Sequence, residues 1–337
     1  MKAIVLVGGR GTRLRPLTLT VPKQMLPVSG RPMVEHVVEH LAGHGVDEVV
    51  LSLGYRPDAF RDAYPDGVCA GLRMSYAVEL EPLDTAGAIA FAARRCGVTD
   101  TFVVVNGDVL TDLDVTALVD FHRRSKAQAS IALTPVEDPS SFGVVVTDPD
   151  GRVQAFVEKP PLDQAPSKLV NAGTYVLEPS AIDAVPTDAR MSIERQLFPQ
   201  LAATRTLYAK ASEARWADIG TPAKYLEANL QGAKTSNPAP GATVERSEIG
   251  AGVTFGAGAQ VTESVLLDGV QIGAGAVVRR SLLGWGARVG DGATVEGLSV
   301  LGAGFVVPPG EHLDGAIVPD VLDETSPAPK QQLSQEA

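Results

Sequence analysis

MKAIVLVGGRGTRLRP, residues 1–16, is a short β-branched run that ends abruptly in glycines. Residues 2–7 have the continuous apolar character of a strand buried on both faces of a parallel sheet, and Gly8 and Gly9 break the run. A buried strand that leads directly into a glycine-rich loop is typical of an α/β ligand site. We therefore predict that these residues form the first strand of such a sheet.

Further apolar runs alternate with helical patterns along the chain that follows. The runs lie at residues 48–53, 73–78 and 102–105, and the helical patterns lie at 33–44 and 85–95. This alternation predicts a Rossmann-like α/β fold with a mainly parallel sheet and helices on both of its faces. After Asp108, strand-like runs and helical patterns no longer alternate regularly.

Glycine-rich hexapeptides fill the chain after Gly241. Apolar residues recur six positions apart at Ile249, Phe255, Val261 and Leu267, and the series continues with two slips to Val307. Segments such as IGAGV and FGAGA lie between them, so each unit offers one inward aliphatic side chain and a turn of small residues. A flexible linker would not keep this register over about ten units, and the repeat predicts a parallel β-helix.

These patterns divide the 337 residues into a first domain at 1–238, a β-helix domain at 239–319 and a tail at 320–337. A helix predicted around Pro222–Gln231 runs into residues 234–241, whose Pro, Ser and Gly content is typical of a linker. The tail has no periodicity, and we expect it to be disordered. Two domains agree with a length that exceeds the usual single core.

Charge and hydropathy narrow the possible partners. The formal net charge of −11 argues against binding to nucleic acid, which requires a surplus of Lys and Arg. No stretch reaches the roughly 18 consecutive apolar residues of a membrane span, and the start has no secretory cleavage pattern. We expect a cytoplasmic protein with no membrane partner.

Glycines and basic residues cluster after the first strand, at Gly8, Gly9, Gly11, Thr12, Arg13 and Lys23. Glycines let backbone N–H groups turn toward phosphate oxygens, while Arg13 and Lys23 supply positive charge against a triphosphate. A dinucleotide-binding loop is excluded because Leu14 replaces its third glycine, and the Gly-Lys-Ser/Thr of a P-loop is absent. A glycine-rich turn with solvated arginines is the alternative to a phosphate site.

The longer segment GGRGTRLRPLTLTVPKQMLPVSGRPM, residues 8–33, resembles the signature of the nucleoside-diphosphate-sugar pyrophosphorylases. The similarity continues, in the order of that family, through NGD at 106–108, FHRR at 121–124, DPSSFGVV at 138–145, FVEKP at 156–160, NAG at 171–173, SIERQLFP at 192–199 and WADIGTP at 216–222. Within the family, the chain is most similar to mannose-1-phosphate guanylyltransferases, some of which also carry a left-handed β-helix. The resemblance implies a sugar-1-phosphate nucleotidyltransferase, which joins an NTP to a sugar 1-phosphate and releases pyrophosphate.

The resemblance also implies roles for single residues. Asp108 and Asp218 would bind Mg²⁺, an ion that prefers oxygen ligands, and Asp108 follows an apolar run at the predicted carboxyl end of a strand. Arg13 would neutralise the leaving pyrophosphate and Lys23 the α-phosphate. Lys159 would hold the sugar phosphate. The rest of the sugar pocket would consist of Glu158, Asn171 and Gly173.

Choice of the base is expected to fall to residues 79–88. Glu79 suits the adjacent N–H donors of guanine, and Asp84 and Thr85 would lie near the nucleotide. Relatives usually have glycine where Asp84 stands, and Gln24 replaces a proline that is common in guanylyltransferases. The best prediction is GTP with mannose 1-phosphate, and a glucose-1-phosphate thymidylyl- or uridylyltransferase is the alternative.

Two other functions are less compatible with the sequence. A second, acyltransferase activity of the β-helix would need a catalytic histidine there, and the chain offers only His312, which we expect beyond the repeats. An inactive sugar-nucleotide sensor would not need Arg13, Lys23 and Asp108 to be intact. We expect the β-helix to form a homo-oligomer instead, because stacked flat faces make good symmetric contacts.

Overall fold

The computed structural model describes residues 1–319 except 55, 188 and 237. The chain forms two compact units, of which the first contains Met1–Gly9 and Pro32–Ile219 and the second contains Arg10–Arg31 and the chain from Gly220 on. The predicted disordered tail at 320–337 lies outside the described residues. Among the described residues, no helix has the length and apolar character needed to cross a membrane.

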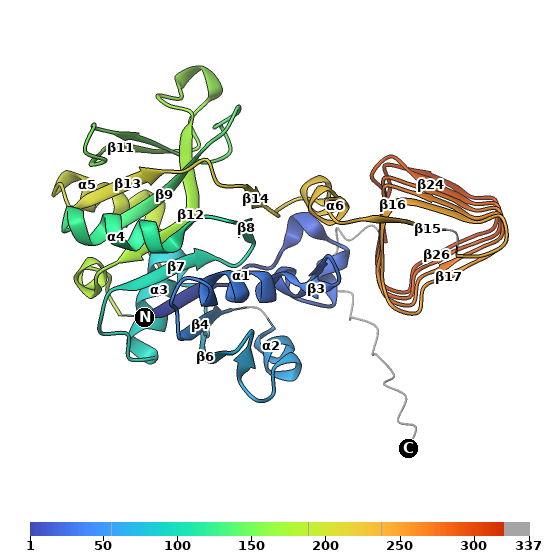
Figure 1. Ribbon diagram of the computed structural model, residues 1–337, viewed down its shortest axis with the longest axis horizontal. Coiled ribbons are helices and arrows are strands. Elements are labelled where there is room, and N and C mark those ends of the chain that lie inside the picture. Colours follow the sequence, from blue (N-terminus) through green and yellow to red (C-terminus); the bar gives the residue numbers. More distant parts are fainter. Residues whose placement is uncertain (55, 188, 237, 320–337) are drawn as a thin grey trace. The chain divides into compact units, whose positions relative to one another are not determined.

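The first unit is built on a ten-stranded sheet (Figure 1). Its parallel part has the order β7 (Phe102–Asn106), β1 (Lys2–Leu6), β4 (Glu48–Leu53) and β6 (Leu72–Val78). β1, β4 and β7 are runs of mostly apolar residues that are buried on both faces, as the sequence predicted, whereas β6 is only partly buried. The parallel part therefore follows directly from the hydrophobic pattern.

The strands after Asp108 make the sheet mixed. β12 (Leu169–Leu177) lies antiparallel to both β7 and β9 (Ala129–Pro135), and β10 (Gly143–Thr147) lies antiparallel to β11 (Val153–Glu158). The remaining strands are β13 (Leu207–Ala211), parallel to β9, and β5 (Val68–Cys69), antiparallel to β6. The predicted parallel character thus holds for the first half of the sheet.

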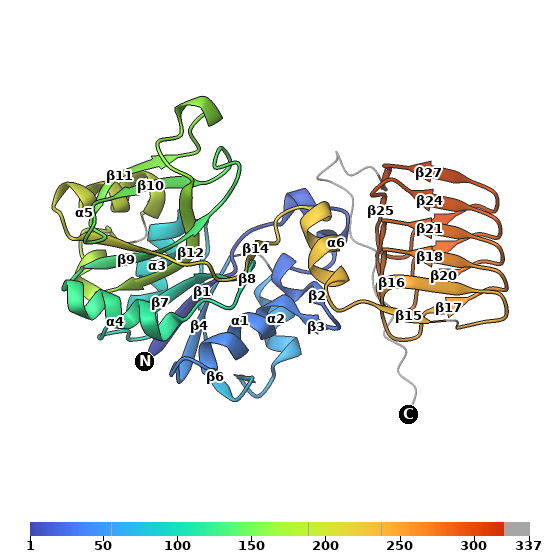
Figure 2. The ribbon, with the colours of Figure 1, turned by 45° about the horizontal axis from the view of Figure 1, so that its top comes forward.

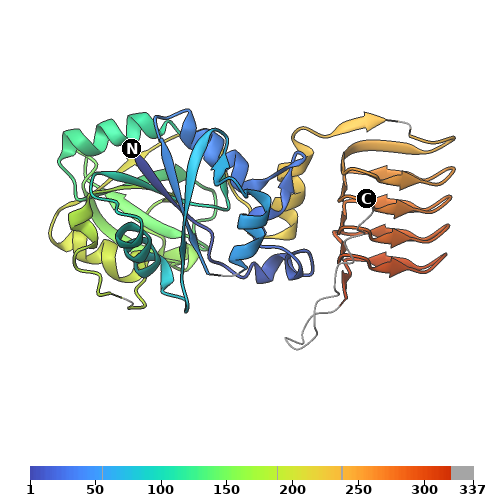
Figure 3. The same cartoon turned by 90° about the horizontal axis from the view of Figure 1, so that it is seen from below.

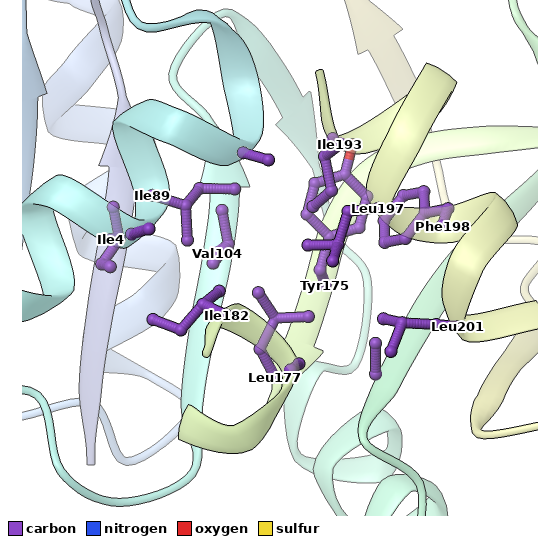
Figure 4. Close-up of a cluster of buried hydrophobic side chains, with 14 of the residues drawn as sticks. Ile4, Ile89, Val104, Tyr175, Leu177, Ile182, Ile193, Leu197, Phe198 and Leu201 are labelled. Atoms are coloured by element: carbon purple, nitrogen blue, oxygen red, sulfur yellow. The ribbon is translucent and has the colours of Figure 1, made fainter. Parts of the chain in front are cut away.

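Helices lie on both faces of the sheet (Figure 3). The helices of the first unit are α1 (Met33–Ala42), α2 (Pro57–Ala63), α3 (Asp84–Arg95), α4 (Val115–Ser125) and α5 (Phe198–Ala203). Ile89 of α3 and Phe198 of α5 share one core with Ile4, Val104 and Tyr175 of the sheet (Figure 4). Burial of this core fixes which side chains of each strand face the helices.

The carboxyl ends of the parallel strands meet at one edge of the sheet. β1 ends before Gly8, β6 ends before Glu79, and β7 ends two residues before Asp108. Ligands of open α/β sheets bind at this edge. The fold therefore brings Gly8, Glu79 and Asp108, which belong to three separate stretches of the sequence, to the same edge of the sheet.

The second unit begins with the glycine-rich segment. This segment forms three single turns of 3-10 helix, Thr12–Leu14, Leu17–Leu19 and Lys23–Met25, and the short strands β2 (Pro27–Val28) and β3 (Arg31–Pro32). The segment packs with α6 (Pro222–Leu230), since the Tyr225 hydroxyl donates to the Pro27 carbonyl at 2.6 Å. The signature is thus held by residues that lie about two hundred positions later in the sequence.

The rest of the second unit is a left-handed parallel β-helix (Figure 2). Its strands are β16 (Thr243–Ile249), β17 (Thr254–Phe255), β18 (Gln260–Thr262), β19 (Val265–Leu266), β20 (Gln271–Ile272), β21 (Val277–Arg279), β22 (Leu282–Leu283), β23 (Arg288–Val289), β24 (Thr294–Glu296), β25 (Val300–Leu301), β26 (Val306–Val307), β27 (His312–Asp314) and β28 (Ile317–Val318). Thr254 pairs with Gln271 and Gln271 with Arg288, so one coil spans 17 residues. β15 (Lys234–Ser236) pairs with β16, so part of the predicted linker is a strand.

Two details of the predicted repeat were wrong. The fourth inward residue of the series is Leu266 rather than Leu267, because a coil of 17 residues contains one unit of five among its units of six. His312 does not lie beyond the repeats: it lies in β27, which pairs with β24. Its Nε2 is 2.9 Å from Glu296 Oε1 on the exposed surface.

Candidate active site

A cavity of about 150 Å³ in the first unit brings together six of the predicted site residues. These are Asp108, Glu158, Lys159, Asn171, Gly173 and Asp218. They come from four distant motifs, and all but Asp218 meet because β7, β12, β10 and β11 follow one another in the sheet. The cavity combines carboxylates, an amide and an ammonium group, which suits a polar, phosphate-bearing ligand.

The two aspartates are brought together by a short pair of strands that the sequence did not predict. β8 (Val109–Thr111) lies antiparallel to β14 (Trp216–Asp218), with Asp218 opposite Val109. The Ile219 N–H donates to the Asp108 carbonyl at 2.9 Å. Asp108 and Asp218 therefore lie at the same end of this pair, on neighbouring strands.

The donor set of this pair fits a hard divalent cation. Carboxylate oxygens are the ligands that Mg²⁺ takes from proteins, usually one or two of them. Nowhere in the described part of the chain do three or more His, Cys, Asp or Glu side chains form a metal site. A cation held by Asp108 and Asp218 would need phosphate and water oxygens to complete its shell.

The backbone aims Lys159 and Glu158 at the cavity. Lys159 has a φ of 49°, which is uncommon for a residue with a side chain, and its N–H donates to the Phe142 carbonyl at 2.9 Å. Its Nζ lies 3.5 Å from Glu158 Oε1. Gly143 gives room to this pair, because a Cβ there would stand 3.1 Å from Glu158 Oε2.

Asn171 is oriented by two hydrogen bonds. Its Nδ2 donates to the Tyr175 hydroxyl at 2.9 Å, and its Oδ1 accepts from the Gly173 N–H at 2.9 Å. Tyr175 is fully buried in the core of Figure 4, and burial raises the pKa of its hydroxyl. Gly173 has a φ of 74°, and a Cβ there would lie 2.6 Å from Asn106 Nδ2. Only glycine lets the strand approach Asn106 this closely.

Glu79 lies beside the start of the glycine-rich loop. Its Oε1 accepts from Ser52 Oγ at 3.1 Å and its Oε2 accepts from the Leu83 N–H at 2.9 Å. A Cβ on Gly8 would stand 3.8 Å from Glu79 Oε1. The carboxylate is thus held in place, and its remaining lone pairs can accept further donors.

Asp84 and Thr85 occupy the start of α3 in an ordered network. Asp84 has a φ of 60°, so the backbone keeps the left-handed conformation that glycine usually adopts, and its Oδ1 accepts from the Thr85 N–H at 2.8 Å. Thr85 Oγ1 donates to Glu194 Oε2 at 2.7 Å and accepts from the Ile193 N–H at 2.8 Å. The Thr85 hydroxyl is therefore engaged with the segment that carries Glu194.

The predicted phosphate residues Gly11, Thr12, Arg13 and Lys23 lie in the second unit. Gly11 has a φ of 62°, and a Cβ there would lie 3.0 Å from Thr18 Cγ2 and 3.1 Å from Lys23 Cβ. Thr18 Oγ1 donates to the Gly11 carbonyl at 2.8 Å. The segment therefore folds back on itself, and Gly11 and Lys23 are neighbours.

Sequence reasoning missed several residues that line the cavity, among them Glu194 and Trp216. Glu194 lies in a single π-helical turn (Ile193–Leu197) and also accepts from Ser192 Oγ at 2.9 Å. Trp216 donates its Nε1–H to the Ala172 carbonyl at 2.8 Å and contacts the Phe142 ring edge-on. Both belong to quoted motifs, but spacing along the chain gives no sign that they face the cavity.

Comparison with known families divides the chain in two. Residues 2–235 match the model of the nucleotidyl transferase family, and residues 233–322 match that of the GMPPB C-terminal domain. Together these matches span the sheet, the glycine-rich segment and the β-helix.

Individual relatives agree with the family match. The chain is 38% identical to the mannose-1-phosphate guanylyltransferase of Mycobacterium tuberculosis, over 94% of this chain and 79% of that protein. It is 41% identical to the mannose-1-phosphate guanyltransferase of Yarrowia lipolytica, over 74% of this chain and 69% of that protein. The crystal structure of HddC from Yersinia pseudotuberculosis complexed with GMP-PN is similar, with a TM-score of 0.59, 30% identity and coverage of 68% and 98% of the two chains.

Proposed function

The chain is a sugar-1-phosphate nucleotidyltransferase that belongs to the nucleotidyl transferase family, and on this premise we propose that it joins GTP to mannose 1-phosphate. A phosphate oxygen of the sugar 1-phosphate attacks the α-phosphorus of GTP. The bond from that phosphorus to the bridging oxygen breaks, and pyrophosphate leaves. The products are GDP-mannose and pyrophosphate.

The observation that carries this proposal is one cavity lined by Asp108, Asp218 and Lys159. The reaction brings two anions together, so most of the catalysis must come from positioning and charge neutralisation. A bound Mg²⁺, held by the two aspartates, would supply positive charge to the phosphates. The other residues of this chain bind and orient the substrates.

The sugar phosphate has a consistent set of partners in this cavity. Lys159 supplies positive charge for its phosphate, and Glu158 can accept from sugar hydroxyls. Asn171 is already oriented by Tyr175 and Gly173, so it needs little reordering when the sugar binds. We assign Arg13 to the leaving pyrophosphate and Lys23 to the α-phosphate.

Guanine as the base is supported by Glu79. The N1–H and N2–H donors of guanine are adjacent, and a carboxylate accepts two such bonds at once. Ser52 and Leu83 hold the Glu79 carboxylate beside Gly8, where the first strand enters the loop. The names of the relatives from M. tuberculosis and Y. lipolytica support the same base and sugar.

The test is pyrophosphate release from GTP, dTTP, UTP and ATP, each with mannose 1-phosphate and with glucose 1-phosphate, with and without Mg²⁺. We expect the pair of GTP and mannose 1-phosphate to have the highest kcat/KM and to require the metal. Glu79→Gln should lower the preference for GTP by orders of magnitude, because a mismatched donor remains unpaired in the site.

Three results would contradict parts of this proposal. Preference for dTTP or UTP would replace GTP and favour the alternative that Gln24 suggested. An unchanged preference in Glu79→Gln would remove Glu79 as the reader of the base. Binding of nucleotides without any pyrophosphate release would favour a sensor over an enzyme.

A further inference from the structure

The middle of one outer face of the β-helix is apolar and buried, although Ile317 at the end of the same row is 51% exposed. Val265, Leu282 and Val300 pair in register along β19, β22 and β25, and each is followed by a leucine that points into the β-helix core. Alternation along a strand therefore turns these three side chains outward. Their exposed fractions are nevertheless 1%, 0% and 1%. Another part of the second unit must cover them.

A second outer face of the same coils gives the contrast. Val306 points outward from β26, and its exposed fraction is 56%. Thr254, Gln271 and Arg288, which line up with it on β17, β20 and β23, are exposed as well. Burial of an outward residue is thus a property of one face and not of the β-helix in general.

Residues around this row contact the glycine-rich segment and α6. A Cβ on Gly302, which follows β25, would stand 3.1 Å from Pro16 Cβ. A Cβ on Gly30 would stand 3.8 Å from Glu248 Oε1 of β16. α6 packs against both β2 and β16. The glycine-rich segment and α6 therefore pack together against this side of the β-helix.

The glycine-rich segment needs such a support. Its regular structure consists of single 3-10 turns and two strands of two residues each, which are too short to persist by themselves. Its apolar residues Leu14, Leu17 and Leu26 are all buried, and the Ser29 N–H donates to Asn229 Oδ1 of α6 at 3.0 Å. Packing from outside the segment fixes the conformation in which Gly11 and Lys23 are neighbours.

We infer that the buried face, consisting of Val265, Leu282 and Val300, is a mount that holds the glycine-rich segment in the conformation that binds the triphosphate. This inference rests on the proposed function, in which Arg13 and Lys23 act on the phosphates. Val300 and Gly302 are then positioning residues, which act on the nucleotide through Pro16 and its neighbours. The β-helix is part of the catalytic apparatus as well as a separate folded module.

The test compares two valines of the same coil in the full chain. Val300→Ala and Val300→Lys alter the mount, and Val306→Ala and Val306→Lys are the matched controls on the exposed face. The first measurement is amide hydrogen exchange of peptides that cover residues 10–31, with peptides from 260–279 as a control for the β-helix. The second measurement is KM for the nucleotide and KM for the sugar phosphate.

We expect faster exchange in residues 10–31 and a rise of about tenfold in KM for the nucleotide in the Val300 variants, with KM for the sugar phosphate unchanged. The Val306 variants should match wild type in both measurements. If Val300→Lys does not fold, Val300→Ala decides. Equal behaviour of the Val300 and Val306 variants, or equal rises in both KM values, would overturn the inference. If wild type releases no pyrophosphate with any substrate pair, the proposed function fails. The comparison of hydrogen exchange then still tests whether the mount holds residues 10–31.

Discussion

Replacing Thr85 by valine removes two hydrogen bonds and leaves the shape of the side chain almost unchanged. Thr85 Oγ1 donates to the Glu194 carboxylate at 2.7 Å and accepts from the Ile193 N–H at 2.8 Å. A hydrogen bond to a charged group contributes about 1.5 to 3 kcal/mol, and a buried donor without a partner costs about 1 to 3 kcal/mol. Because these groups are only partly buried, we expect the lower ends of both ranges, and Thr85→Val should lose about 2 to 3 kcal/mol of unfolding free energy.

The matched control is Thr85→Ser, which keeps the hydroxyl and should lose less than about 1 kcal/mol. Urea unfolding can be followed by tryptophan fluorescence, and Trp285→Phe leaves Trp216 as the only tryptophan, so that the signal reports the first unit. Because Glu194 lines the cavity, KM for the sugar phosphate should also rise in Thr85→Val. If Thr85→Val is as stable as Thr85→Ser, the hydroxyl does not hold Glu194, and the reasoning is refuted.

Three further predictions concern the metal, the sugar pocket and pH. Asp108→Asn and Asp218→Asn should each lower turnover by about a hundredfold or more with an unchanged circular dichroism spectrum, and near-normal turnover at saturating Mg²⁺ would remove either residue as a ligand. Gly173→Ala should cost about 1 to 2 kcal/mol of stability in urea unfolding, since its φ is 74°, and should raise KM for the sugar phosphate through Asn106. Burial lowers the pKa of His122 below 6.5, so the neutral ring stabilises the fold above pH 6.5, and this stability is lost as the pH falls through the lowered pKa. The decrease in Tm between pH 7 and pH 5 should be smaller in His122→Gln than in wild type. Equal decreases in the two proteins would contradict the assignment of this pH dependence to His122.

The parallel half of the sheet could be predicted because its strands are buried on both faces. Such strands appear as continuous apolar runs, and the chain has them at β1, β4 and β7. The pair β8 and β14 could not be predicted in the same way. Each of these strands has three residues, and their pairing depends on a contact between residues 109 and 218 that no local pattern encodes. The meeting of Asp108 and Asp218 in one cavity therefore required the structure.

The β-helix was predictable as a repeat but not in its register. Six-residue spacing identifies one inward side chain per unit, yet the coils close after 17 residues, or after 18 between Arg288 and Val306. The unit of five has no sequence marker, since Leu266 and Leu267 are equally apolar. Stacking on the coil below selects Leu266, because only that register aligns it with Leu283.

Motif residues differ in ways that spacing cannot reveal. Glu79 and Thr85 lie in the same predicted nucleotide-binding stretch, yet Thr85 uses its hydroxyl to hold Glu194, while Glu79 is held by Ser52 and Leu83. A motif is selected for the site as a whole, which includes the residues that orient the contacts as well as the contacts themselves. Tyr175, which orients Asn171, is another such residue, and its sequence position suggests only a core tyrosine.

In the glycine-rich segment, the residues predicted to bind the ligand differ from the residues that determine the conformation. The prediction that its basic residues, Arg13 and Lys23, act on phosphates rests on the sequence, because charge near glycines suits phosphate. Its conformation, by the inference drawn above, depends also on packing against the β-helix, where Pro16 lies beside Gly302. The predicted boundary at residue 238 would place the segment and that part of the β-helix in different domains, although every motif lies before the boundary. The extent of each compact unit depends on which apolar residues are buried together, whereas the motifs reflect the predicted contacts with the substrates.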